Sequence, residues 1–245
     1  MSAAIPDVLR IRRHQPTRLE GFVDASFAFA VTLLMISIGH LPQSVPEMLH
    51  ALRGTPAFAL CFLSIARIWK SHRDWSRHYD IEDSTSLVLS LLLVFVVLVF
   101  VYPLRLLFAL FFAWISAGHL ADQPLELRDV EDLRAAFEVY GIGFGAIAGL
   151  FALLYRHALR NARTIGLDAR EMIATRMHVA IWTGFVALAA LSILSALLLP
   201  FRNDQPWVYT IPGMIFALSG VVTTAIRRRY ASRIAALGAP DAVAR

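Results

Sequence analysis

The sequence has 245 residues, of which 58% are hydrophobic and only 17% charged, and its mean hydropathy is +0.61. This composition lies outside the range of soluble globular proteins and predicts an all-α integral membrane protein. The net charge is +5, but the basic residues stand in short clusters between apolar runs rather than along one surface. We therefore expect the lipid bilayer, and no nucleic acid, among the partners of this chain.

Six apolar segments are candidates for transmembrane helices, since a helix needs about 20 mostly apolar residues to cross the hydrocarbon core. The second segment is the weakest, because it is short and contains Arg67, whose charge has to be shielded by protein or reach the membrane surface. The sequence predicts a six-helix transmembrane domain over residues 18–229, after an N-terminal segment 1–17 and before a tail 230–245. The six segments are residues 20–40, 56–73, 86–114, 136–156, 177–200 and 206–226.

The charges of the loops predict that both termini are cytoplasmic, because cytoplasmic loops are enriched in Lys and Arg. All but five of the 23 lysines and arginines lie in the N-terminal segment, in the second and fourth loops and their flanks, and at the C-terminus. The third loop, on the opposite side, carries a group of acidic residues. The five basic residues on that side are Arg53, Arg105, Arg128, Arg134 and Arg202.

Asp24 stands near the start of the first span, where a carboxylate needs a partner. An ionised group at the centre of a transmembrane helix costs roughly 2.5–3.5 kcal/mol on insertion scales, so it usually faces protein or water. Residues expected at a similar depth are Arg18, Arg67, Trp69 and His72. We expect Asp24 to find its partner among them.

An apolar stripe follows the first span at spacings of four and three residues, as one face of a helix requires. Its members are Phe22, Ser26, Phe29, Leu33, Ile36 and His40. Asp24 lies about 140° from Phe29 around the helix. If the stripe faces other copies of the same helix, Asp24 faces back into its own subunit. By periodicity alone, ordinary contact of the stripe with lipid or with another helix is the alternative.

The sequence contains no strand pattern, glycine-rich phosphate loop, zinc-ligand spacing or nucleophile elbow. We therefore predict no enzyme activity, no catalytic residue, no bound metal and no cofactor.

The start of the first span resembles a known family. Arg18, Phe22 and Asp24 form R-x-x-x-F-x-D, which is similar to the R-x-x-x-F-S-D signature of the transmembrane protein 175 family. The likeness continues through Trp69 and His72 of the second span to "FVYPLRLLF" at the end of the third, over about the first 110 residues. The family comprises potassium-permeable channels with six helices per repeat. Its prokaryotic members resemble single-repeat chains assembled as homotetramers.

The resemblance implies that four copies of the first helix line a pore whose narrow part is formed by Phe29, Leu33 and Ile36. Thr32 is a candidate for selectivity through its hydroxyl or carbonyl oxygen, although a bond from the hydroxyl to its own helix is an equal alternative. Phe29 is a departure, because the family commonly has a branched aliphatic residue there.

The resemblance also suggests that Asp24 does not touch the ion. As a hypothesis, it ties the first helix to the second and third, with His72 and Trp69 as the first partners to consider. Val23 replaces the serine of the signature, which removes one hydroxyl from this tie.

The function that follows is a leak-type, potassium-permeable cation channel in the inner (plasma) membrane, with potassium as the permeant ion. A proton- or ion-coupled secondary transporter, in which Asp24 and His72 titrate, is the first alternative. It would need discontinuous helices, which the first three spans do not indicate. The second alternative is a non-conducting membrane scaffold.

Overall fold

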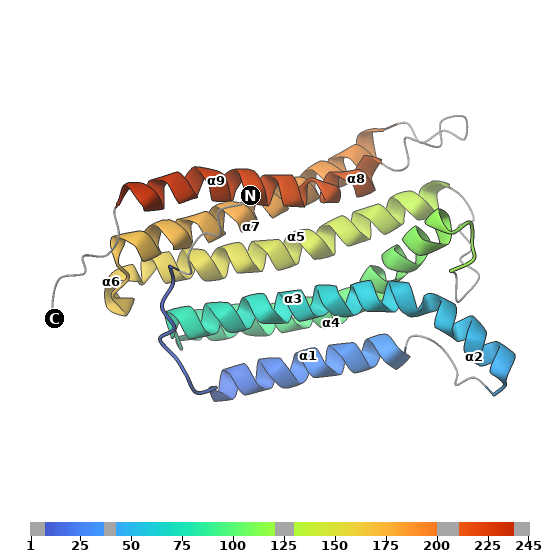
Figure 1. The fold of residues 1–245 in the computed structure, drawn as a ribbon, viewed down its shortest axis with the longest axis horizontal. Coiled ribbons are helices and arrows are strands. Elements are labelled where there is room, and N and C mark those ends of the chain that lie inside the picture. Colours follow the sequence, from blue (N-terminus) through green and yellow to red (C-terminus); the bar gives the residue numbers. More distant parts are fainter. Residues whose placement is uncertain (1–7, 37–42, 121–129, 200–210, 238–245) are drawn as a thin grey trace.

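A computed structural model of the chain describes residues 8–36, 43–120, 130–199 and 211–237, and within these ranges every regular element is a helix. The long helices lie side by side as a bundle, with α1 at one edge and α9 at the other (Figure 1). The elements are α1 (Arg18–Ile36), α2 (Val45–Ala51), the short 3-10 helix η1 (Leu52–Gly54), α3 (Thr55–Tyr79), α4 (Ser84–Ile115), α5 (Val130–Arg160), α6 (Ala162–Ile165), α7 (Ala169–Leu198), α8 (Ile211–Ala217) and α9 (Ser219–Ala236).

Five helical stretches of the described residues are long and apolar enough to cross a membrane, so the chain is a multi-pass membrane protein. They are Arg18–Ile36, Val45–Tyr79, Ser84–Ile115, Glu131–Arg160 and Ala169–Leu198. The second of them is longer than the weak segment 56–73, because α2 and η1 precede α3 without a break and α3 continues to Tyr79 through a run of charged residues. The end of the first predicted span, residues 37–40, lies outside the described residues.

The sixth predicted span, residues 206–226, corresponds to two helices rather than one. α8 and α9 meet at Leu218 and together run back along α7 (Figure 1). Neither of them meets the length and hydropathy expected of a span, and residues 206–210 lie outside the described ranges. α9 also continues to Ala236, beyond residue 229, where the tail is predicted to start. A sixth transmembrane helix stays a prediction.

Capping residues fix the turns at one end of the bundle. α4 begins with a capping box, in which the Asp83 carboxylate accepts from the Ser86 N–H at 2.8 Å and the Ser86 hydroxyl accepts from the Asp83 N–H at 3.0 Å. Asp168 and Glu171 form the same arrangement at the start of α7. Such reciprocal bonds satisfy N–H groups that have no partner within the helix. α3 ends at Tyr79, and the next residue, Asp80, caps it in a left-handed conformation with φ 50°.

Close helix packing in the middle of the bundle depends on small residues of α5. A Cβ atom added to Gly143 would lie 2.1 Å from the Phe100 ring of α4, and one added to Gly141 would lie 2.6 Å from Ile193 of α7. The glycine-rich run of α5 therefore lets α4 and α7 approach the α5 backbone, as small residues do in membrane helices. α5 itself is continuous through this run.

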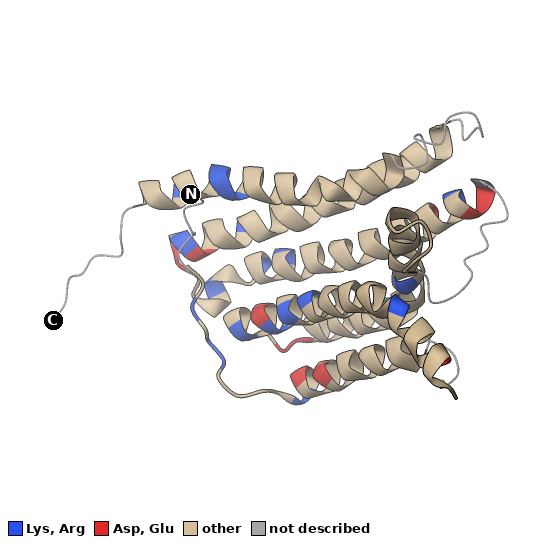
Figure 2. Ribbon diagram, turned by 45° about the vertical axis from the view of Figure 1, so that its right-hand side comes forward, with Lys and Arg blue, Asp and Glu red and all other residues tan. Residues whose placement is uncertain are grey.

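Most charged residues of the described chain lie toward one end of the bundle (Figure 2). At this end α1, α4 and α7 begin and α3, α5 and α9 finish (Figure 1). Those residues predicted from the loop charges to be cytoplasmic that the structure describes thus lie toward the same end. Pro103 lies inside α4. The green C-terminal part of α4 rises away from α3 toward α5 in Figure 1.

Candidate pore helix

α1 has one face packed into the chain and one face left open. Val23, Phe27, Ala30 and Leu34, spaced by three or four residues, are buried in the core. This face packs against α3 and α4, while α1 itself lies at the edge of the bundle (Figure 1). Close packing of these four side chains against α3 and α4 fixes the rotation of the helix about its own axis, since helices in a membrane associate through van der Waals contact.

The open face of α1 contains most of the apolar stripe. In the single chain Phe22 is 54% exposed, Phe29 55% and Ile36 65%, so the open face of this bundle-edge helix is apolar. Leu33 is half-buried at the boundary of the two faces. Phe29 and Ile36 are therefore available to a surface outside this chain.

The two hydroxyl side chains on or beside the stripe bond to their own helix. Ser26 donates to the Phe22 carbonyl at 2.8 Å, and Thr32 donates to the Ala28 carbonyl at 3.1 Å. The intrahelical alternative for Thr32 is thus the one the structure contains. Its hydroxyl oxygen keeps lone pairs that can accept or coordinate, and the side chain is exposed.

Asp24 faces α3 rather than the open surface. The Trp69 indole donates its Nε1–H to an Asp24 carboxylate oxygen at 2.7 Å. Arg73 stacks over the Trp69 ring, with its guanidinium carbon 5.0 Å from the ring centroid. A hydrogen bond to an ionised acceptor is among the stronger ones in proteins. This contact joins α1 to α3 next to the buried face of α1.

His72 is not hydrogen-bonded to Asp24 but belongs to a separate tie between α3 and α4. Its Nε2 atom lies 2.9 Å from the Ser90 hydroxyl, and both side chains are buried. The His72 ring also lies 6.1 Å from the Trp75 ring. Trp69 and His72, three residues apart on α3, therefore connect that helix to two different neighbours.

A second ionic contact at the start of α1 was missed in the sequence. Arg77 Nε donates to the Glu20 carboxylate at 3.0 Å, and Glu20 is buried. The register of the two antiparallel helices could have revealed it, since Glu20 lies one turn before Asp24 and Arg77 lies two turns after Trp69. The Glu20 N–H is in turn capped by the Thr17 hydroxyl at 3.2 Å.

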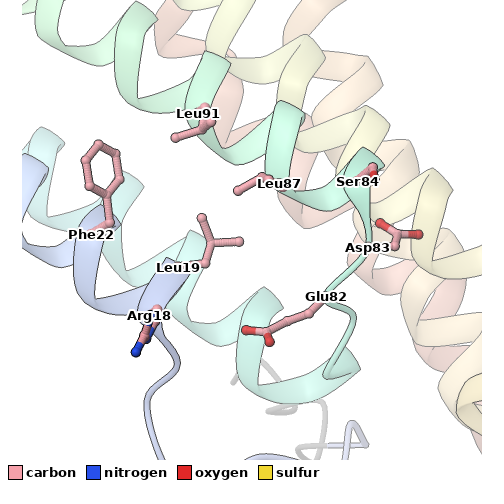
Figure 3. A pocket seen from close by; sticks show the side chains of 8 residues that line it. All are labelled: Arg18, Leu19, Phe22, Glu82, Asp83, Ser84, Leu87 and Leu91. Carbon is pink, nitrogen blue, oxygen red and sulfur yellow. The ribbon is translucent and has the colours of Figure 1, made fainter.

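Arg18 lies at the rim of an open groove between α1 and α4 (Figure 3). The groove has a volume of about 650 Å³ and largely apolar walls. The Arg18 side chain points away from those walls and is exposed. The lining residues are Arg18, Leu19, Phe22, Glu82, Asp83, Ser84, Leu87 and Leu91.

Asp83, at the start of α4, joins this groove to α5. Its carboxylate lies 2.7 Å from His157 Nε2. Burial works against the charged form, but hydrogen bonds from the Ser86 N–H and from His157 hold the pKa of Asp83 below its ordinary value. Among the described residues, no group of three His, Cys, Asp or Glu side chains could hold a metal ion.

Comparison with known proteins identifies the arrangement. The family described as endosomal/lysosomal potassium channel TMEM175 matches residues 18–103, a stretch that starts at Arg18 and includes every residue proposed for the site. A solved structure described as the potassium channel MtTMEM175, a threonine-to-alanine variant in complex with a nanobody–MBP fusion protein, superposes with a TM-score of 0.78 at 27% identity. The superposition covers 93% of this chain and 98% of the solved chain. The chain thus resembles the TMEM175 family in sequence over residues 18–103 and a solved member of that name in fold over most of its length.

Two curated relatives extend the likeness beyond the first 110 residues of the chain. A potassium channel of Marivirga tractuosa is 29% identical over 228 residues, which make up 89% of this chain and 92% of that protein. A potassium channel of Streptomyces collinus is 28% identical over 187 residues, covering 73% of this chain and 83% of that protein. These relatives are named as channels and not as enzymes.

Proposed function

We propose that this protein is a leak-type, potassium-permeable cation channel, with potassium as the permeant ion and no cofactor. The observation that carries the proposal is the open apolar face of α1 on a helix whose other face is packed. Four chains arranged about one axis would bring Phe29 and Ile36 of each copy toward that axis. The potassium channels similar to this chain in sequence and fold support the same function.

The narrow part of the pore is assigned to rings of Phe29, Leu33 and Ile36, which are one helical turn apart. Such apolar side chains offer no hydrogen bonds to water, so ions pass only when the constriction is wide enough to stay hydrated. Thr32, on the exposed surface beside Leu33, is the nearest polar side chain. Its hydroxyl group donates to the Ala28 carbonyl, and we propose that the lone pairs of the hydroxyl oxygen contribute to selectivity.

Asp24 is proposed to hold the pore helix rather than to bind the ion. Its hydrogen bond from Trp69 directs the carboxylate toward α3, and the His72–Ser90 contact fixes α3 on α4. Arg18 and Phe22, the other residues of the signature, lie at the start of the open face. A defined rotation of α1 is what keeps the constriction side chains directed to the axis.

The proposed location is the inner (plasma) membrane with both termini in the cytoplasm and a channel domain over residues 18–229. The charged end of the bundle supports this orientation, because cytoplasmic ends are rich in Lys and Arg. α8 and α9 together would supply the sixth crossing beside α7.

The test is cation flux into liposomes that contain the purified protein, with potassium compared with sodium. Leu33→Asn should alter the flux or its selectivity, because it places an amide at the constriction. Leu194→Asn on α7 is the matched control, since it makes the same change at an exposed apolar position away from α1. Its flux should equal that of the wild type. Equal flux in all three proteins would disprove the assignment of Leu33, and absence of flux in the wild type would favour a carrier or a scaffold.

A further inference from the structure

Residues 8–17 form a strap across the charged end of the bundle, and we refer to them as the N-terminal strap. The strap passes from the start of α7, along the end of α3 and the start of α4, to the first turn of α1 (Figures 1 and 2). It is anchored to the end of α3 by its backbone, because the N–H groups of Arg12 and Arg13 donate to the Arg77 carbonyl at 2.9 and 3.1 Å. The strap therefore touches three parts of the bundle that are far apart in the sequence.

Arg12 is the central anchor of the strap. Its Nη1 and Nη2 atoms donate to the two carboxylate oxygens of Glu171 at 2.9 and 2.7 Å, and Nη1 also donates to the His78 carbonyl at 3.1 Å. The Arg12 side chain is 18% exposed and that of Glu171 only 1%. The hydrogen bond to Glu171 outweighs desolvation by burial and raises the pKa of Arg12. A bidentate pair of this kind fixes both distance and angle.

The Glu171 carboxylate makes further hydrogen bonds besides those from Arg12. Its carboxylate also accepts from the backbone N–H groups of Arg10 and Asp168, both at 3.1 Å. The second of these belongs to the capping box of α7. Loss of the Arg12–Glu171 pair would therefore affect the position of both the strap and the start of α7.

The strap reaches α1 by two routes. Along the chain, only four residues separate Arg13, which pairs with Asp80 and Glu82, from Arg18 at the start of α1. Across space, Arg77 binds the strap with its carbonyl and the buried Glu20 of α1 with its guanidinium. Because one residue holds both, movement of the strap and movement of the first turn of α1 are coupled.

We infer that Arg12 and Glu171 form a latch that positions the cytoplasmic end of α1 and so sets how often the pore is open. Arg12 acts as a positioning residue, because it acts through the strap and Arg77 rather than on the ion. The inference rests on the proposed function of α1 as the pore helix. Nothing in the latch touches the constriction residues, which lie further along α1.

Single-channel recording of the wild type, Arg12→Ala and Arg10→Ala in planar bilayers tests the latch. Arg10→Ala is the matched control, because it also removes one arginine of the strap, but from an exposed ion pair with Asp168 in which Arg10 is 72% exposed. We expect Arg12→Ala to change the open probability by about fivefold or more, the usual size of a coupling between sites. The unitary conductance should stay unchanged, and Arg10→Ala should behave as the wild type.

The open probability of a single channel reports the position of α1 and not the amount of folded protein. A variant that folds less well would lower only the number of channels in the bilayer. Arg12→Lys, which keeps the charge but loses the bidentate geometry, takes the place of Arg12→Ala if the alanine variant does not assemble. An open probability that Arg12→Ala or Arg12→Lys leaves unchanged would overturn the latch.

A second measurement distinguishes failure of the latch from failure of the proposed channel function. Trypsin cleavage after Arg13, a residue kept in both single variants, reports release of the strap in detergent. Faster cleavage in Arg12→Ala than in Arg10→Ala would show that Arg12 holds the strap on the bundle even if the wild type carries no current, a result that would refute the channel function and with it the effect on pore opening. Equal cleavage in the two variants counts against the latch in either case.

Discussion

The Trp69 indole nitrogen lies 2.7 Å from the Asp24 carboxylate and joins the helix with the open apolar face to its neighbour in the bundle. The contact connects the first and second spans between residues 45 positions apart. Since Trp69 also lies under the Arg73 guanidinium, the indole is held from both sides. The orientation of α1 thus depends on an aromatic donor rather than on apolar packing alone.

Trp69→Phe should destabilise the protein, because it keeps an aromatic ring but removes the donor to Asp24. Hydrogen bonds to charged groups contribute about 1.5–3 kcal/mol, so we expect a loss near the lower end of this range for a half-buried carboxylate. Thermal unfolding of the purified protein in detergent measures it. Trp114→Phe is the control, since Trp114 is 70% exposed, and its midpoint should match the wild type. A Trp69→Phe midpoint equal to that of Trp114→Phe would contradict the proposed tie.

Ser90→Ala should destabilise the α3–α4 contact, because it leaves the buried His72 ring nitrogen without its hydroxyl partner. An unsatisfied buried polar group costs about 1–3 kcal/mol. Ser64→Ala, which removes a hydroxyl bonded to the Leu60 carbonyl of its own helix, should cost less. The two variants are compared by the same unfolding measurement. The interpretation fails if Ser64→Ala proves to be the more damaging change.

The sequence predicted the multi-pass fold and the family, because long apolar runs and a local signature carry that information. It also placed Asp24 and Phe29 on different sides of the first helix, since helical periodicity alone determines that angle. The end of α3 was predicted too early. The charges between Arg73 and His78 make that stretch look like a loop, although Arg77 pairs with Glu20 of another helix.

The role of the N-terminal strap could not be derived from the sequence. Its arginines look like ordinary topology signals, and their partners lie far away: Glu171 is 159 positions from Arg12 and Asp80 is 67 positions from Arg13. No periodicity links residues so distant along the chain. The break at Leu218 between α8 and α9 was missed, although Ser219 and Gly220 directly after it are residues that favour a turn.

Gly143→Ala should destabilise the bundle because its methyl group would collide with the Phe100 ring of α4. Overpacking a well-packed core usually costs about 1–3 kcal/mol. Gly149→Ala is the matched control on the same helix, since its added Cβ would meet Val186 at 3.9 Å, an ordinary contact. That variant should be neutral or slightly more stable, as alanine favours helix by up to about 1 kcal/mol over glycine. Recovery of stability in Gly143→Ala combined with Phe100→Leu would identify the collision as the cause.

Asp83 should make stability depend on acid pH. Its pKa is lowered by hydrogen bonds from Ser86 and His157 that outweigh the effect of burial. A carboxylate with a lowered pKa contributes stability above its ordinary pKa, near 3.8, and that contribution is lost as the pH falls through the lowered value. Asp83→Asn keeps a side-chain oxygen for the Ser86 N–H but has no charge for His157. The wild type should therefore unfold at a higher temperature than Asp83→Asn near neutral pH, and the difference should shrink between about pH 5 and pH 3. A difference in midpoint that stays constant over this range would show that ionised Asp83 does not stabilise the start of α4.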